Sequence, residues 1–194
     1  MNDEINEINE EPSKNDKGAF ASVFEWVELI ALYFSVAIVV LVLLFAHSPV
    51  VGTSMNPTLN ENDLLIVRKL AYTPKQGDII VCQYESNMQH PLVKRVIATE
   101  GQTVSIDYNA RTITVDGVVL NEDYITDGSN PFDTSDYLPS TFTVDKGKVF
   151  VMGDNRNVGK SLDSRYSSVG LIDERYVLGK VCLRLMPLSN IEFF

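Results

Sequence analysis

The pattern of apolar and polar positions divides the chain into two unequal parts. Residues 29–46 form an apolar run without a charged side chain, in which only Tyr33 and Ser35 carry polar side-chain atoms. As an α-helix rising about 1.5 Å per residue, this run and the apolar residues just before it cover the hydrocarbon core of a bilayer, about 30 Å thick. The pattern predicts a transmembrane anchor over residues 23–47, with Trp26 near one interface.

Two other interpretations of this run can be weighed from the sequence. A cleavable signal peptide has a short basic leader, whereas the 28 residues before the run are rich in acidic side chains. A helix in the core of a soluble domain carries polar residues at helical spacing, and the run lacks that pattern. We therefore expect a single uncleaved anchor.

The few basic residues near the anchor predict its orientation. Lys14 and Lys17 precede the run, and the next basic residue after it is Arg68. Because Lys and Arg accumulate on the cytoplasmic side of membrane spans, we expect residues 1–22 to form an acidic cytoplasmic tail, disordered because it is so polar. Residues 48–194 then form an extracytoplasmic domain.

Beyond the anchor, short apolar runs alternate with turn signals. The runs are rich in β-branched and aliphatic residues and have the length of strands; they cover residues 64–67, 79–82, 92–97, 103–106, 112–115, 149–152 and 176–183. Asp116 and Gly117 separate two such runs and predict a tight hairpin, and residues 126–140 predict an exposed loop. The pattern predicts a mostly antiparallel β domain, folded as packed sheets or as an open barrel.

Composition narrows the classes of function. The chain is 45% hydrophobic and 22% charged, which is typical of a globular protein, and its net charge of −10 argues against nucleic-acid binding. Two cysteines, Cys82 and Cys182, cannot form a disulfide scaffold or a four-cysteine zinc site, and two histidines do not make a His-rich metal centre. These counts argue against a metal centre built from cysteine or histidine ligands. Whether the two cysteines pair or remain buried thiols stays open.

Ser54 is the first candidate for nucleophilic chemistry. It stands between Gly52 and Pro57, where a turn can expose its hydroxyl and bring backbone N–H groups close enough to form an oxyanion hole. Because Gly-x-Ser segments are also common in ordinary turns, the serine becomes a catalytic candidate only with a base beside it.

Lys94 is the strongest candidate for that base. Apolar residues flank it in a predicted strand, so burial would disfavour its charged form and lower its pKa from about 10.4. The alternative is a lysine whose ammonium reaches solvent. His47 at the membrane edge and His90 in a predicted loop are weaker candidates. Residues 152–165 add two acid–arginine pairs and two serines, either as a solvated turn or as a rigid loop that orients the lysine.

Taken together, these segments resemble the bacterial type I signal peptidases. The matching motifs, in the family's order, are Gly52-x-Ser54-Met55-x-Pro57-Thr58, Gly77-Asp78-Ile79-Ile80-Val81, Lys94-Arg95-Val96-Ile97, Gly153-Asp154-Asn155-Arg156 and Ser161-x-Asp163-Ser164-Arg165. The resemblance extends over residues 50–187, and the short chain with one anchor is similar to the single-span, Gram-positive-type members.

The resemblance implies roles for individual residues. Ser54 matches the nucleophile and Lys94 the general base of a Ser–Lys dyad, and Ser161 matches the hydroxyl that orients the lysine. Four further residues match supporting positions: Asp163 and Arg165 a structural ion pair, Arg95 a supporting arginine, and Met55 a position near the substrate groove.

The resemblance also implies a fold and a function. The family's fold is largely antiparallel β and needs no metal or cofactor. Its members are membrane-bound serine endopeptidases that remove N-terminal signal peptides from exported preproteins after small residues in an Ala-x-Ala pattern. The partners would be preproteins and the lipid bilayer, without nucleic acid or metal. The location would be the bacterial cell membrane, in a single pass with the N-terminus cytoplasmic.

Two departures from the family's pattern matter for the site. Residues 157–160 make the segment before Ser161 two residues longer than usual, so they must bulge outward if Ser161 is to reach Lys94. Position 52 is a glycine where some members place a serine, so we expect backbone N–H groups, chiefly that of Ser54, to form the oxyanion hole.

Two other functions stay open from the sequence. One is a catalytically inactive, membrane-tethered β domain that binds translocated polypeptides without cleaving them. The other is Ser–Lys self-cleavage, as in the SOS repressors, although those carry a DNA-binding module where this chain has an acidic tail and an apolar run. Lys94 argues against the eukaryotic-type signal peptidases, which use a histidine at that position.

Overall fold

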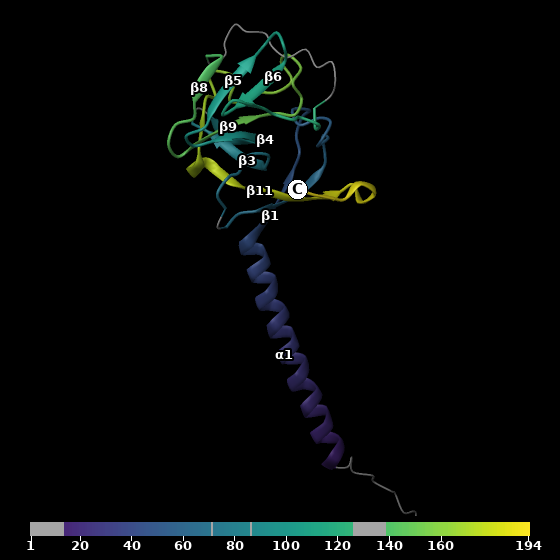
Figure 1. The fold of residues 1–194 in the computed structure, drawn as a ribbon. Coiled ribbons are helices and arrows are strands. Elements are labelled where there is room, and N and C mark those ends of the chain that lie inside the picture. The colour runs from purple at the N-terminus through teal and green to yellow at the C-terminus, as the bar shows by residue number, and fades with distance from the viewer. Residues whose placement is uncertain (1–13, 71, 86, 126–138) are drawn as a thin grey trace, which may run out of the picture. The chain divides into compact units, whose positions relative to one another are not determined.

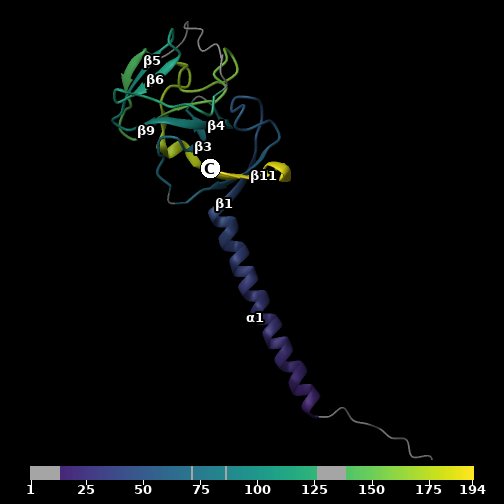
Figure 2. The same ribbon diagram turned by 45° about the vertical axis from the view of Figure 1, so that its right-hand side comes forward.

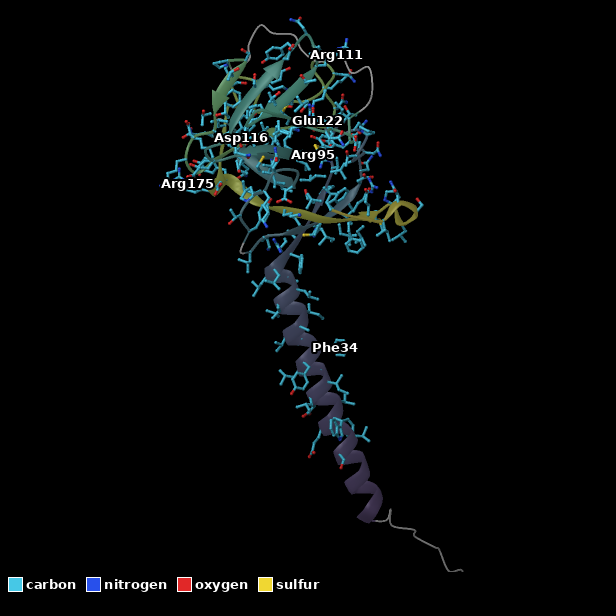
Figure 3. The ribbon with its side chains drawn as sticks, viewed as in Figure 1. Phe34, Arg95, Arg111, Asp116, Glu122 and Arg175 are labelled. Atoms are coloured by element: carbon cyan, nitrogen blue, oxygen red, sulfur yellow. The ribbon has the colours of Figure 1, made fainter. Side chains whose placement is uncertain are left out.

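One long helix precedes the β domain. The computed structural model describes residues 14–70, 72–85, 87–125 and 139–194, and it divides into two compact units between Leu43 and Leu44. Helix α1 (Lys14–Leu44) contains the apolar segment Ser22–Leu44, whose mean hydropathy is 2.8. The apolar side chains of residues 23–43 are exposed, as Phe34 illustrates in Figure 3. By length and composition, this helix can cross a membrane.

The helix differs from the predicted anchor at both ends. It begins at Lys14, so residues 14–22 are helical where the sequence predicts a disordered tail. Apart from Gly18, residues 18–22 contain no strong helix breaker, and the helix therefore extends through them. It ends at Leu44 rather than at residue 47, because the next five residues pair with another strand. Residues 1–13 of the predicted tail lie outside the described residues.

Among the residues that the structure describes, eight strands form the larger sheet, and all their pairings are antiparallel. The order is β1 (Phe45–Pro49), β2 (Leu64–Arg68), β11 (Val177–Met186), β3 (Ile79–Tyr84), β4 (Asn87–Thr99), β9 (Lys148–Met152) and β10 (Ile172–Asp173), and β12 (Glu192–Phe193) pairs with β11. Two 3-10 helices, η1 (Glu174–Tyr176) and η2 (Leu188–Asn190), flank β11. Strand β4 lies inside the sheet, so its backbone is bonded on both sides.

The smaller sheet packs against the larger one. Its order is β7 (Val118–Val119), β6 (Thr112–Val115), β5 (Thr103–Asp107) and β8 (Thr141–Thr143). Figures 1 and 2 show it beside β9 and β4, at the opposite end of the β domain from β1. One apolar cluster contains side chains from both sheets, among them Val104, Ile113 and Phe150, and the rings of Phe142 and Phe150 meet edge-on with centroids 5.0 Å apart.

The architecture confirms the predicted fold class, a mostly antiparallel β fold with one N-terminal apolar helix. Each predicted run overlaps a strand, and positive φ angles of 51° at Asp116 and 82° at Gly117 form the predicted hairpin turn. The sequence does not predict β1, because its first residues continue the apolar run. The predicted loop lies outside the described residues over 126–138. Cys82 and Cys182 are both free thiols.

Candidate active site

Lys94 lies in the middle of β4, opposite Ile80 of β3. Its side chain is only 2% exposed, although it is a lysine. The amine Nζ donates a hydrogen bond to Ser54 Oγ at 2.7 Å and another to the Val93 carbonyl oxygen at 3.0 Å. The structure therefore brings together the two residues that the sequence singles out as nucleophile and base, and it is Lys94 rather than a histidine that contacts the serine.

Burial lowers the pKa of Lys94 below its ordinary value, because a charged amine loses its hydration inside the domain. The negative charge of Asp163 acts in the opposite direction, and the positive charge of Arg165 reinforces the lowering. Burial wins. The amine is thus neutral over a wider pH range than that of an exposed lysine, which is what a proton acceptor at this position needs.

Ser54 belongs to a turn that packs on the sheet. Met55 and Leu59 are buried in one apolar cluster beneath this turn, and Leu59 N donates to the Met55 carbonyl oxygen at 2.9 Å. The Ser54 carbonyl oxygen accepts a hydrogen bond from Asn155 N at 3.0 Å, and Asn155 Nδ2 donates to the Thr53 carbonyl oxygen at 2.9 Å. The apolar packing of Met55 and Leu59 and the two hydrogen bonds of Asn155 thus fix the position of this turn. Met55 itself is 1% exposed, so its side chain packs in the core.

Gly153 allows the closest approach in the site. A Cβ added at this position would lie 2.2 Å from Ser161 Oγ and 2.3 Å from the Ser54 carbonyl oxygen. Both distances are far too short for any side chain. Because residue 153 is a glycine, the Ser161 hydroxyl and the Ser54 carbonyl oxygen can both lie close to its Cα. Apart from the motif that contains Gly153, nothing in the sequence indicates this contact.

Ser161, Asp163 and Arg165 form a buried polar group. The Ser161 hydroxyl donates to Asp163 Oδ2 at 2.6 Å, Gly153 N donates to the same oxygen at 3.0 Å, and Arg165 Nε donates to Asp163 Oδ1 at 2.8 Å. Burial alone would raise the pKa of Asp163, but the charge of Arg165 and these hydrogen bonds outweigh it and hold that pKa below its ordinary value. The predicted ion pair of Asp163 and Arg165 is thus present.

Comparison with known proteins assigns the family. The family described as signal peptidase, peptidase S26, matches residues 23–186. Signal peptidase I of Bacillus licheniformis is 35% identical over 194 residues, covering 95% of this chain and 98% of that protein. Signal peptidase IB of Staphylococcus aureus (strain MRSA252) is 32% identical over 186 residues, covering 88% of this chain and 93% of that protein.

The chain belongs to the signal peptidase family. It is a serine endopeptidase of the signal peptidase I type, and relatives of that name support cleavage of signal peptides. A solved signal peptidase I from Enterococcus faecalis V583 is 32% identical, with a TM-score of 0.45, and the match covers 56% of this chain and 97% of that one. In the part of the chain that the structure describes, no three His, Cys, Asp or Glu side chains come together as ligands for a metal ion.

Arg95 stabilises the site of this signal peptidase from the face of β4 opposite to that of Lys94. Its guanidinium pairs with Asp154 through two bonds, Nε to Oδ1 at 2.8 Å and Nη2 to Oδ2 at 2.6 Å. Thr58 Oγ1 donates to the same carboxylate at 2.5 Å. The Arg95 guanidinium also lies 3.9 Å from the centroid of the Tyr124 ring. Because Thr58 follows the Ser54 turn and Asp154 follows Gly153, this bidentate pair ties the two segments to the sheet.

Two buried ion pairs of the site are not predicted from the sequence. Arg156 Nε donates to the Gly153 carbonyl oxygen at 2.9 Å, and its Nη1 pairs with Glu122 at 3.1 Å. Glu122 lies on the same side of the β domain as Arg95 in Figure 3. Arg184 Nη1 donates to the Thr58 carbonyl oxygen at 2.7 Å and pairs with Asp63 at 3.4 Å. The sequence positions of Glu122 and Arg184 do not predict these contacts, because the paired residues come together only in the folded domain.

The extra residues before Ser161 form an exposed turn. Lys160 N donates to the Asn157 carbonyl oxygen at 3.1 Å, and Gly159 has a φ of 70°, which a glycine adopts without strain. All four residues of 157–160 are exposed, whereas Ser161 is 2% exposed. The insertion therefore bulges outward and leaves Ser161 inside the domain, but the Ser161 hydroxyl donates to Asp163, and the hydrogen bonds of Lys94 Nζ go to Ser54 Oγ and the Val93 carbonyl oxygen rather than to Ser161.

Proposed function

We propose that this chain is a membrane-anchored signal peptidase I in which Ser54 is the nucleophile and Lys94 the general base. One observation carries the proposal: the buried Lys94 amine lies 2.7 Å from Ser54 Oγ. When the amine is neutral, the same contact lets the Ser54 hydroxyl donate its proton to the Lys94 nitrogen.

The reaction follows from this contact. Lys94 accepts the Ser54 proton as Oγ attacks the carbonyl carbon of the scissile peptide bond, and the resulting oxyanion is stabilised by backbone N–H groups, chiefly that of Ser54. The protonated Lys94 then gives its proton to the leaving amine as the C–N bond breaks. A water molecule, deprotonated by Lys94, attacks the acyl-enzyme and releases the signal peptide with a free carboxylate.

The surrounding residues position this pair. Asp163 accepts a hydrogen bond from the Ser161 hydroxyl, which leaves the lone pairs of Ser161 Oγ available to orient the Lys94 amine during the reaction; in this structure Lys94 Nζ donates to Ser54 Oγ and the Val93 carbonyl oxygen instead. Arg165 and Arg95 support the two segments through Asp163 and Asp154. Met55, buried beneath the Ser54 turn, packs in the core and holds this turn beside the proposed substrate groove.

The substrate and the location complete the proposal. The substrates are preproteins with small residues such as alanine at the first and third positions before the cut. The apolar helix that ends at Leu44 forms the anchor, residues 1–22 form a cytoplasmic tail, and the extracytoplasmic catalytic domain begins with β1 at Phe45. Support comes from the apolar segment Ser22–Leu44 and from Lys14 and Lys17 ahead of it.

A cleavage assay tests the proposal. The full chain in detergent is incubated with a preprotein that has an Ala-x-Ala site, beside Ser54→Ala, Lys94→Ala and the control Lys160→Ala, which removes an exposed lysine. Mass spectrometry of the products should show a new N-terminus after the second alanine for wild type and the control only. Binding of the preprotein without cleavage by the wild type would instead support a catalytically inactive, tethered β domain.

A further inference from the structure

A cleft of about 300 Å³ lies beside β2 and β11, lined by Arg68, Tyr72, Thr73, Lys75, Asp78 and Lys180. It shares no lining residue with the Ser54 and Lys94 site. Arg68 ends β2 and lies opposite Lys180 of β11 in the sheet. In Figures 1 and 2, β1 and β11 lie together at one end of the β domain.

The lining of this cleft is positively charged, although the whole chain is acidic. Asp78 is the one acid among the described lining residues, and its carboxylate is already engaged by Lys180 Nζ at 2.7 Å and by the Tyr72 hydroxyl at 2.7 Å. Lys180 thus neutralises Asp78. Two cations, Arg68 and Lys75, are exposed at the cleft with no lining acid left to balance them.

The sequence reinforces this excess of positive charge. Residues 64–77 contain three basic side chains and no acidic one, in a chain whose net charge is −10. The third is Lys69, which is exposed beside Arg68. Leu70, the next residue, is 53% exposed, so an apolar side chain stands beside the basic ones.

The cleft adjoins the point where the apolar helix ends. Lys69 N donates to the carbonyl oxygen of Leu44 at 2.9 Å, and Phe45 pairs with Arg68 in the sheet. Leu44 is the last residue of α1. If α1 spans the bilayer, as proposed above, then Leu44 lies at the membrane surface and Arg68 lies at the level of the lipid headgroups. Basic and aromatic side chains beside an exposed leucine are typical of that level.

We propose that this cleft binds the phosphate of an anionic phospholipid headgroup. The planar guanidinium of Arg68, whose Cζ lies over the Tyr72 ring at 5.7 Å from its centroid, offers paired donors to two phosphate oxygens. Lys75 adds a second positive charge, and Leu70 contacts the acyl region. The bound lipid fixes the β domain to the membrane beside its anchor. This inference rests on the proposed transmembrane span, not on the chemistry of Ser54.

Native mass spectrometry of the full chain in detergent tests the proposal. Phosphatidylglycerol or phosphatidylcholine is titrated into wild type, into Arg68→Gln/Lys75→Gln, and into Arg111→Gln/Lys146→Gln, which removes the same charge from exposed positions elsewhere. Wild type and the control should retain phosphatidylglycerol over phosphatidylcholine. The cleft variant should bind phosphatidylglycerol roughly thirtyfold more weakly, from two surface cations at their usual contribution. Lys180 is kept, so its ion pair with Asp78 stays intact.

Three results would overturn the proposal: equal retention by the cleft variant and wild type, an equal loss in the control variant, or saturation of wild type by inorganic phosphate alone, which would mean a free-ion site. Preprotein cleavage is measured on the same samples. Cleavage by the cleft variant in detergent should match wild type, so a failure of lipid binding is distinguished from a failure of the proposed peptidase. Lys75→Gln alone, at an exposed position, gives a weaker loss if the double variant is unstable.

Discussion

Lys94 Nζ lies 2.7 Å from Ser54 Oγ, although forty positions separate the two residues in the chain. The strand carrying Lys94 lies inside the larger sheet, and the turn carrying Ser54 is pressed against that sheet by Met55 and Leu59. The contact is thus fixed by the core rather than by local sequence. Burying an amine there costs stability, since a charged group loses its hydration.

Replacing Lys94 by Met should separate stability from activity. Met fills a similar volume without a group that needs hydration, so we expect the free energy of unfolding to rise by about 1 kcal/mol. Cleavage should fall by roughly 10²–10⁴-fold, the usual contribution of a general base. Thermal unfolding and preprotein cleavage measure the two effects. A clear loss of stability would mean that the lysine is kept for structure.

Gly153→Ala should damage the site through sterics alone. Its Cβ would collide with Ser161 Oγ and with the Ser54 carbonyl oxygen, so the two segments must move apart. We expect a loss of about 1–3 kcal/mol in stability and a marked drop in kcat. The control is Gly159→Ala, where a Cβ meets nothing within 4 Å and only backbone strain is added. Equal activity of both variants would show that the close approach is not needed.

Glu122→Gln should weaken the segment that carries Gly153. The change leaves the Arg156 guanidinium buried without its counter-charge, which should cost roughly 3–5 kcal/mol of stability. Denaturant unfolding measures this loss. The matched control is Asp173→Asn, which breaks an ion pair with the exposed Arg175 and should leave the midpoint nearly unchanged. If both variants unfold at the same denaturant concentration, the Glu122 pair contributes no more than a surface pair.

Asp163→Asn should shift the pH dependence of cleavage. The charge of Asp163 raises the pKa of Lys94, so its removal should lower that pKa and move the rise in activity to lower pH. Stability should change with pH as well. Because the pKa of Asp163 is lowered on folding, its carboxylate stabilises the wild type above its unfolded pKa, and this contribution is lost as pH falls through the lowered pKa. The variant should lack that acid transition. An unshifted activity profile would contradict the coupling of Asp163 to Lys94.

Local patterns predict much of this fold, and their success has a physical reason. The strands follow β-branched runs, and the hairpin at Asp116 and Gly117 follows from a turn that needs positive φ angles. Ser54 and Lys94 can be named as candidates because a tight turn can expose a serine hydroxyl and apolar neighbours can bury a lysine, but each pattern alone is also common in ordinary turns and strands. The sequence could not place them 2.7 Å apart without the family resemblance.

The unpredicted parts depend on long-range packing. β1 is a strand because residues Phe45–Pro49 pair with β2. This pairing outweighs the helix that the apolar run predicts for the first residues of β1. The contacts of Glu122 with Arg156 and of Arg184 with Asp63 join segments far apart in the chain. Ion pairs of this kind have no local signature, so spacing alone cannot reveal them.

The pH dependence of single-turnover preprotein cleavage tests the central claim most directly. If Lys94 is the base, the rate should rise with pH as its amine loses a proton and reach a plateau. The midpoint should lie below the ordinary lysine pKa of about 10.4, because burial lowers the pKa of Lys94. Circular dichroism at each pH confirms that the fold is intact. A rate that is flat, or that falls above neutrality while the protein remains folded, would contradict Lys94 as the base.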